Sequence, residues 1–286
     1  MEKTTTLKAT QSMMSSFFKE LRNFRRGRVS VAQEIRRQTI FRKNLEALLQ
    51  KRVNTAFRRF LRSSMFLYRE TGIYEPEIAR DRLNEELFPV MLSFYRRVFL
   101  ATYQNNEEYY NRSMKDEAEA VVFGKNKDIE ILVKEYFRTK ELILAGISTR
   151  QARQIGREIE KLRAEELTLP QIAREVTKKF TKIQRSRAAL IARTETHNAA
   201  SFANHKYHMD IGNDLGLNLK KRWCAVNDDR TRSFHASANG QTVDANSDFI
   251  VNGMPMAHAG DSRGGAKNVI NCRCVILYVD ENDIVR

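Results

Sequence analysis

The sequence is poor in the residues that mark disulfide-rich, secreted or membrane-spanning proteins. Its 286 residues include three cysteines, one tryptophan and four prolines. Three cysteines cannot all pair with one another, which argues against a disulfide framework. No apolar run approaches the ~18 to 20 residues that span a bilayer, and Met1 to Thr10 lacks the apolar stretch of a secretory signal. We therefore expect a cytosolic protein with no contact to a membrane.

The chain is basic, and its positive charge is concentrated towards the N-terminus. The formal net charge is +15, and residues 1–80 carry 18 Lys and Arg against 7 Asp and Glu. Such a surface attracts polyanions, most commonly nucleic acid, because binding releases counterions. A docking face for an acidic protein ring and an ordinary solvated helix surface are the alternatives. The candidate DNA contacts, which would neutralise phosphates without reading bases, are Arg22, Arg25, Arg26, Arg28, Arg36, Arg37, Arg58 and Arg59.

Helix-forming residues dominate from about Ser12 to Ile211, and apolar residues recur there at 3- and 4-residue spacing. The hydrophobic content of 42% is enough to build a core in one large or two ordinary domains. One apolar stripe predicts a helix that packs against other helices, and it consists of Phe41, Leu45, Leu48, Leu49, Val53, Phe57 and Phe60.

Glycine, proline and capping residues divide this helical part. Gly72 to Pro76 predicts a break, and Pro89 a bend in the following helix, at 81–103. The other expected elements are a helix over 107–122, a turn at 124–127, a helix from Asp128 to a stop near Gly146, a helix from Ser148 to 166, a short helix from Thr168 to 180 and a last one over 183–212.

The pattern changes after Gly212 to short apolar runs between Gly, Asn, Asp and Ser residues. Strands are expected at 220–226, 241–243, 249–251 and 275–279, with a hairpin turn at Asn239-Gly240. The predicted fold class is mainly α with a small C-terminal α+β module: a long helical N-terminal body is followed by short strands and hairpins. We divide the chain into a basic helical region (1–147), a helical connector (148–216) and the module (217–286).

The cysteines admit more than one interpretation. Cys224, His235, Cys272 and Cys274 are a set of ligands that a tetrahedral zinc ion accepts. Alternatively, Cys272 and Cys274 share the inner face of the last strand, with Arg273 opposite, and pack against Trp223. We expect packing and no cofactor, with zinc left open as the alternative and a redox role as a third interpretation.

A second group of residues suggests chemistry. Asp228, Asp229, Arg230, Arg232 and His235 combine carboxylate, guanidinium and imidazole groups, which together can carry out acid–base or phosphodiester chemistry. A turn followed by a helix start explains the same residues. A metal-dependent nuclease would need a second acidic or histidine ligand near His235, for which the candidates are His258 and Asp261.

The order and spacing of several short motifs together resemble one known family. The sequence is similar to the phage Mu F-like head morphogenesis family of minor head proteins over roughly 168–280. The matching pieces are Ile191-Ala192-Arg193-Thr194-Glu195-Thr196, Asn198, Lys221-Arg222-Trp223, Asp229-Arg230-Thr231-Arg232, His235, Asn239-Gly240-Gln241, Phe249, Pro255, Gly260-Asp261 and Asn271-Cys272-Arg273-Cys274. Cys224 departs from the family pattern, which weakens a four-ligand zinc site.

The resemblance implies a minor capsid protein of a tailed bacteriophage with no enzymatic activity. It would lie in the virion, inside the head near the portal vertex, in several copies, after synthesis in the host cytoplasm. Its expected partners are the portal protein or the major capsid protein and double-stranded genome DNA, bound without sequence preference. Proteins of this kind can be fused to toxin domains, but we expect none here.

The motif residues are expected to be structural. Trp223, Phe249 and Pro255 would form the small core of the module, and Arg193 with Glu195 would tie the preceding helix to it. The full set of structural motif residues is Arg193, Glu195, Trp223, Asp229, Arg230, Arg232, His235, Gly240, Asn271, Cys272, Arg273 and Cys274.

Overall fold

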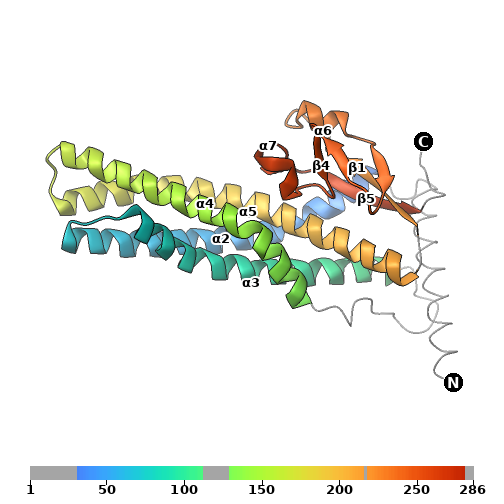
Figure 1. The fold of residues 1–286 in the computed structure, drawn as a ribbon, viewed down its shortest axis with the longest axis horizontal. Helices are drawn as coiled ribbons and strands as arrows, with labels where there is room; N and C mark the ends of the chain where they lie inside the picture. Colours follow the sequence, from blue (N-terminus) through green and yellow to red (C-terminus); the bar gives the residue numbers. More distant parts are fainter. Residues whose placement is uncertain (1–30, 112–128, 216–217, 281–286) are drawn as a thin grey trace, which may run out of the picture. The chain divides into compact units, whose positions relative to one another are not determined.

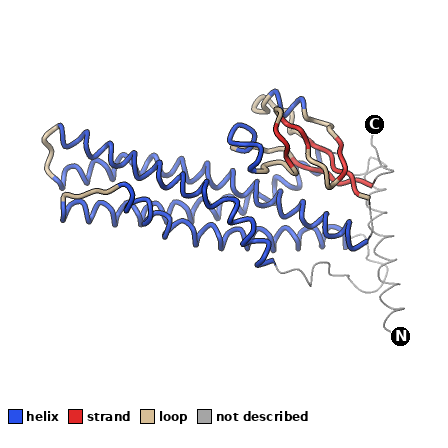
Figure 2. The backbone as a smooth tube through the Cα atoms, in the orientation of Figure 1, coloured by secondary structure: helices blue, strands red, loops and turns tan. Residues whose placement is uncertain are grey.

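The computed structural model describes residues 31–111, 129–215 and 218–280. The four long helices are α2 (Val31–Thr71), α3 (Pro76–Asn111), α4 (Ile129–Ala164) and α5 (Leu169–Leu215). The C-terminal module, residues 218–280, contains β1 (Leu219–Cys224), α6 (Ser233–Ser237), β2 (Thr242–Asp244), β3 (Phe249–Val251), β4 (Met254–Met256), η2 (Ser262–Gly264), α7 (Gly265–Val269) and β5 (Val275–Asp280). Figure 2 shows the strands confined to this module, so the predicted fold class is confirmed.

Two of the predicted helix boundaries are confirmed. The break between α2 and α3 falls at Gly72, where the backbone has φ +69° and the N–H donates to the Tyr68 carbonyl. The start of α5 is marked by Gln171, whose Oε1 accepts from the Thr168 N–H at 2.9 Å. Pro89 lies inside α3, as predicted. No helix within the described ranges combines the length and apolar character that crossing a membrane requires.

Two other boundaries were predicted wrongly. The expected stop at Gly146 and cap at Ser148 both lie inside α4, which is continuous. Gly146 does not have the positive φ with which a glycine ends a helix, and Ser148 is buried rather than capping. The two helices predicted at 168–180 and 183–212 are one helix, α5, in which the polar Gln184 is buried and interrupts the apolar stripe without ending the helix. The elements predicted between 112 and 128, with the cap at Asp128, lie outside the described residues.

The described residues form two compact units. The first, the bundle unit, comprises residues 44–97 and 130–195. Its helices pack through aromatic contacts such as Phe88 against Phe137, whose ring centroids are 5.5 Å apart. The Tyr95 hydroxyl donates to the Glu195 carboxylate at 2.7 Å. From the predicted apolar stripe, Leu49, Val53, Phe57 and Phe60 are fully buried.

The second, the mixed unit, comprises residues 31–43, 98–111, 196–215 and the C-terminal module. Its sheet has the strand order β2-β1-β5, and both pairs are antiparallel. One sheet face carries Cys224, Val275 and Leu277, which pack against Val31 and Ile35 of α2. The opposite face builds the module core. The sheet is therefore covered on both faces, which explains why β1 and β5 are rich in buried residues (Figure 1).

The tight hairpin of the module lies where the sequence analysis did not place it. β3 and β4 pair in antiparallel register across Asn252 and Gly253, which have φ +52° and +73°. Two successive positive φ angles are what a two-residue hairpin loop needs. Asn239-Gly240 instead follows α6, and Gly240, with φ +85°, donates its N–H to the Trp223 carbonyl at 2.8 Å. The predicted hairpin at Asn239-Gly240 is thus wrong, and β4 was missed.

Candidate functional site

The C-terminal module is built around Trp223. This side chain is fully buried at the centre of a hydrophobic cluster. Its ring centroid lies 5.5 Å from that of Phe249 and 5.7 Å from that of His235, in both cases edge to face. Pro255 is exposed, so its predicted place in the core is wrong. Met256 occupies that position instead, because successive residues of β4 point to opposite faces.

A histidine and two cysteines converge beside this tryptophan. His235 is carried by α6, while Cys272 and Cys274 precede β5, which begins only at Val275. The prediction that the two thiols lie on the last strand is therefore wrong. Both thiols nevertheless point into the Trp223 cluster. The Nδ1 atom of His235 lies 3.3 Å from the Cys274 Sγ and 3.8 Å from the Cys272 Sγ. All three side chains are buried.

An ion pair holds the segment that presents the two cysteines. Arg273, between them, donates two hydrogen bonds to the Asp228 carboxylate. Asp228 also accepts from the Thr231 hydroxyl at 3.1 Å, and these partners, Arg273 first, hold the pKa of its carboxyl well below the usual range. Asn271 turns the chain with φ +56°. Because the Arg273 side chain is directed to Asp228, the neighbouring thiols face the core together.

Cys224 does not belong to this group. Its side chain lies on the opposite face of the sheet, in the cluster with Val275 and Leu277. Trp223 and Cys224 are adjacent on β1, and adjacent residues of a strand point to opposite faces. A zinc site that uses Cys224 together with His235, Cys272 and Cys274 is therefore ruled out by the fold.

The acidic residues that a nuclease would need do not join His235. Asp228 is engaged by Arg273, and Asp229 is exposed. Asp261 accepts from the backbone N–H of Ala257 and from Arg263, so it caps a loop. His258 contacts the rings of Phe202 and His205. Within the part of the chain that the structure describes, the one group of potential metal ligands is His235, Cys272 and Cys274.

Three further motif residues hold loops of the module. Arg232 donates to the carbonyl of Ile270, which links the start of α6 to the end of α7. Arg230 is exposed and lies 3.7 Å from the Asp228 carboxylate. Asn198 lies so close to Gly260 that an added Cβ at Gly260 would be 2.3 Å from the Asn198 Oδ1. The glycine is required for this close approach between α5 and the loop that follows β4.

Arg193 and Glu195 find partners in the bundle unit. Arg193 forms an ion pair with Glu46 at 3.4 Å, and Glu195 accepts from Tyr95. Burial raises the pKa of Tyr95, and the adjacent Glu195 carboxylate adds to this effect, so the tyrosine stays a hydrogen-bond donor. Their predicted role in tying α5 to the module remains a prediction.

His197, in the motif region of α5, is not among the predicted site residues. It is buried, its Nδ1 contacts the Arg42 guanidinium, and its ring interacts with Cys272. Burial, reinforced by Arg42, lowers the pKa of His197, so the ring is neutral. The pKa of Cys272 is lowered by a hydrogen bond from Cys274 and by His197 and His235, whereas that of Cys274 is raised by the same thiol pair. The only sequence signal for His197 was the polar run from Thr194 to Asn198, which also fits an exposed helix face.

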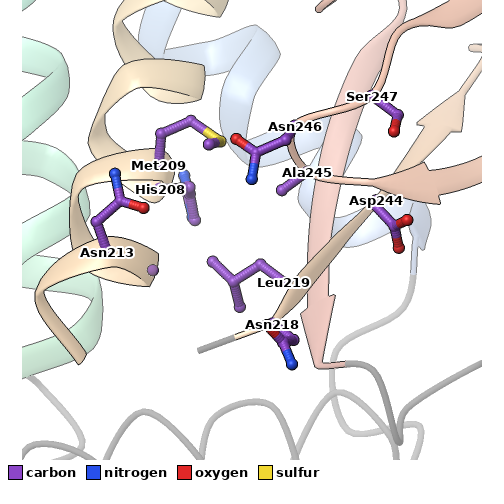
Figure 3. A pocket seen from close by; sticks show the side chains of 10 residues that line it. His208, Met209, Asn213, Asn218, Leu219, Asp244, Ala245, Asn246 and Ser247 are labelled. Atoms are coloured by element: carbon purple, nitrogen blue, oxygen red, sulfur yellow. The ribbon is translucent and has the colours of Figure 1, made fainter. Parts of the chain in front are cut away.

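The mixed unit also contains a polar cavity of about 400 Å³. Figure 3 shows His208, Asn213, Asn218, Asp244 and Asn246 around it. The cavity contains none of the predicted site residues. Burial lowers the pKa of His208 to about 4, and its ring stacks on Tyr278 with centroids 4.1 Å apart, which gives it a packing role.

Among the predicted DNA contacts, Arg36, Arg58 and Arg59 are exposed on α2. Arg37 is engaged by Glu34 at 2.7 Å and by the Asn105 side chain at 2.7 Å. The remaining predicted contacts, Arg22, Arg25, Arg26 and Arg28, lie outside the described residues. DNA contact by these side chains remains a prediction.

Comparison with known proteins identifies the part of the chain that contains this site. Residues 152–277, a little under half of the chain, match the family described as phage Mu protein F like protein. The matched Mu F-like region spans the last third of α4, all of α5 and nearly all of the C-terminal module. The predicted resemblance is thereby confirmed.

Two curated proteins are similar to parts of the chain. An NAD(+)--arginine ADP-ribosyltransferase EFV of Enterococcus faecalis is 33% identical over 99 residues, which cover 35% of this chain and 20% of that protein. The minor head protein GP7 of Bacillus phage SPP1 is 28% identical over 114 residues, which cover 40% of this chain and 36% of that protein. The chain thus spans between a fifth and two fifths of the length of these relatives. No solved structure matches the chain significantly.

Proposed function

We propose that this chain is a minor head protein that takes part in head morphogenesis of a tailed bacteriophage. The observation that carries the proposal is the Mu F-like region at residues 152–277, supported by the similarity to the minor head protein of phage SPP1. In this proposal the chain acts by interaction and not by catalysis. Among the described residues, Asp228 is bound by Arg273 and is not part of the group formed by His235, Cys272 and Cys274.

The ADP-ribosyltransferase similarity does not change this proposal. It covers a fifth of that protein, whereas the activity in its name belongs to the whole of it. The matched stretch is 99 residues long for the ADP-ribosyltransferase and 114 residues long for the minor head protein of phage SPP1. A common module attached to different partners accounts for both matches, since function resides in sites and not in shared folds.

The proposed place of the chain is the inside of the head near the portal vertex. Its proposed partners there are the portal protein or the major capsid protein, with several copies of the chain in each particle. We expect quantitative mass spectrometry of purified proheads and virions to find the chain at a copy number near that of the portal protein and far below that of the capsid protein. Absence from both particles, or a copy number equal to that of the capsid protein, would contradict the proposal.

The proposed contact with genome DNA rests on exposed arginines of α2. Arg58 and Arg59 are adjacent and exposed, and Arg62, one turn further along, is exposed on the same side as Arg58. Arg59 lies 3.9 Å from Glu86, a weak ion pair at an exposed position. Charges of this kind remain available to phosphates, and neutralising phosphates releases counterions.

Reversal of two of these charges tests the proposed DNA-binding surface. The double variant Arg58→Glu, Arg59→Glu should bind duplex DNA more weakly, and the slope of log affinity against log salt should fall by about 2, one for each phosphate that is no longer neutralised. Fluorescence anisotropy with DNA duplexes of unrelated sequence measures both quantities. The matched control is Arg153→Glu, Arg157→Glu on α4, which reverses two exposed arginines and makes the same change in net charge. Equal weakening in the two double variants would show that α2 does not bind the DNA.

A further inference from the structure

We propose that His235, Cys272 and Cys274 bind a zinc-class divalent cation. One potential ligand atom from each residue lies within 4.8 Å of the others, and all three side chains are buried. Thiolate sulfur and imidazole nitrogen are the donors that zinc prefers in proteins. This set differs from the one considered from the sequence, because the fold removes Cys224.

The distances fit ligands that surround a common centre. With Zn–N and Zn–S bonds of about 2.0 and 2.3 Å, the N···S edge of a tetrahedral site is roughly 3.5 Å. The two distances from the His235 Nδ1, 3.3 Å to Cys274 and 3.8 Å to Cys272, lie on either side of this value. The ligand atoms are therefore already arranged around a position where an ion would contact all three.

Both sulfurs face one nitrogen, the His235 Nδ1. The Nδ1 atom of a neutral imidazole has a single lone pair and accepts one hydrogen bond. A thiol at Cys274 would satisfy His235, while the Cys272 sulfur, which also pairs with Cys274, faces the same nitrogen at 3.8 Å. A cation between the three atoms accounts for both short approaches.

Two buried ring nitrogens also interact with the thiol pair. The Trp223 Nε1 and the His197 Nε2 are buried and form no hydrogen bond of normal geometry with protein atoms. The indole interacts with the Cys274 sulfur, and the His197 ring interacts with the Cys272 sulfur. Thiolates bound to a metal are good acceptors for such N–H groups, which fix the ligands from outside the coordination sphere. The site thus gives two otherwise unexplained buried donors a partner.

The contact with Arg42 determines which ring nitrogen of His197 carries the proton. A guanidinium has donors and no acceptor, so the His197 Nδ1 that it contacts must accept, and the neutral ring carries its proton on Nε2. A protonated Nε2 cannot bind a cation but can donate to the Cys272 sulfur. His197 is therefore a positioning residue. The described residues supply three ligands, and a water molecule would take the fourth position of a tetrahedral ion.

The local fold explains how the ligands are held. Cys272 and His235 are 37 residues apart, so an ion between them joins α6 to the segment before β5. The Arg273–Asp228 pair orients the Cys272–Cys274 segment from the other side. In a module with short strands, such an ion adds stability because its ligands come together only in the folded state.

Metal content of the full-length protein tests the site directly. Protein expressed in zinc-supplemented medium and purified without chelators should contain about one zinc per chain by elemental analysis. X-ray absorption should show two sulfur neighbours at about 2.3 Å and nitrogen or oxygen at about 2.0 to 2.1 Å. Cys272→Ser and Cys274→Ser should each lower the zinc content at least tenfold. The control Cys224→Ser, which also replaces a buried thiol, should keep it.

Two outcomes would overturn the proposal. One is wild-type protein that is metal-free and takes up no zinc on titration. The other is bound zinc whose absorption spectrum shows no sulfur neighbours. Both measurements use the wild-type chain, so they decide the question even if the cysteine variants fail to fold. His197→Gln separates positioning from ligation: it should retain the two-sulfur signature and weaken zinc affinity by about 10- to 100-fold.

Discussion

Replacement of Trp223 by alanine should unfold the C-terminal module and leave the bundle unit folded. The side chain is completely buried and contacts Phe249 and His235, so its removal leaves a large cavity at the centre of the module core. Substitutions of this kind cost roughly 3 to 5 kcal/mol. Hydrogen exchange followed by mass spectrometry should show that protection disappears over 218–280 and persists over 44–97 and 130–195.

A matched control separates burial from aromatic content. Phe66→Ala removes an aromatic ring that is 56% exposed, and it should leave the exchange pattern unchanged. If Trp223→Ala leaves protection in the module at the wild-type level, the indole does not support the core. If it also removes protection from the bundle unit, the two units do not unfold independently.

Gly260→Ala is expected to have the second large effect. Gly260 has φ +84°, and an added Cβ would lie 2.3 Å from the Asn198 Oδ1 and 3.2 Å from the Asn198 Cα. Asn198 is fully buried, and rotation of its side chain cannot relieve the approach to its Cα. The left-handed backbone costs about 1 to 2 kcal/mol for alanine, and the overlap with packed atoms adds about 1 to 3 kcal/mol. A fall in the thermal midpoint and increased proteolysis of the module would measure this destabilisation.

The control for Gly260 is Gly253, in the turn between β3 and β4. It also has a positive φ, +73°, but an added Cβ would meet no atom within 4 Å. Gly253→Ala should therefore show the backbone cost alone, about 1 to 2 kcal/mol. Equal destabilisation by the two substitutions would mean that the close approach of Asn198 contributes nothing.

Local sequence signals predicted the elements that depend on neighbours along the chain. The break at Gly72, the start of α5 and strand β3 were found because glycine, proline and apolar alternation act within a few residues. The same signals failed at Gly146 and Asn239-Gly240. Gly146 is tolerated because packing stabilises the helix around it. The two-residue hairpin loop is formed by Asn252-Gly253 and not by Asn239-Gly240.

The candidate site could be predicted only in part. Trp223, His235, Cys272 and Cys274 were selected because cysteine, tryptophan and histidine are scarce in this sequence and clustered in its last quarter. Cys224 was included wrongly, since a list of ligand types does not say which sheet face a residue occupies. His197 was missed because the residue that gives it a role, Cys272, is distant along the chain.

The sequence by itself determined the class of the protein: helical periodicity, short C-terminal strands and an ordered set of motifs are properties of residues near one another or of their order. The tertiary structure decided which of the motif residues meet. Cys272 and Cys274 contact His235, while Cys224 packs against α2 on the opposite face of the sheet. The reason is that strand pairing and the approach of α5 to the module bring together residues from distant segments. Sequence patterns indicate residue chemistry and local conformation, but they do not show which distant residues come into contact.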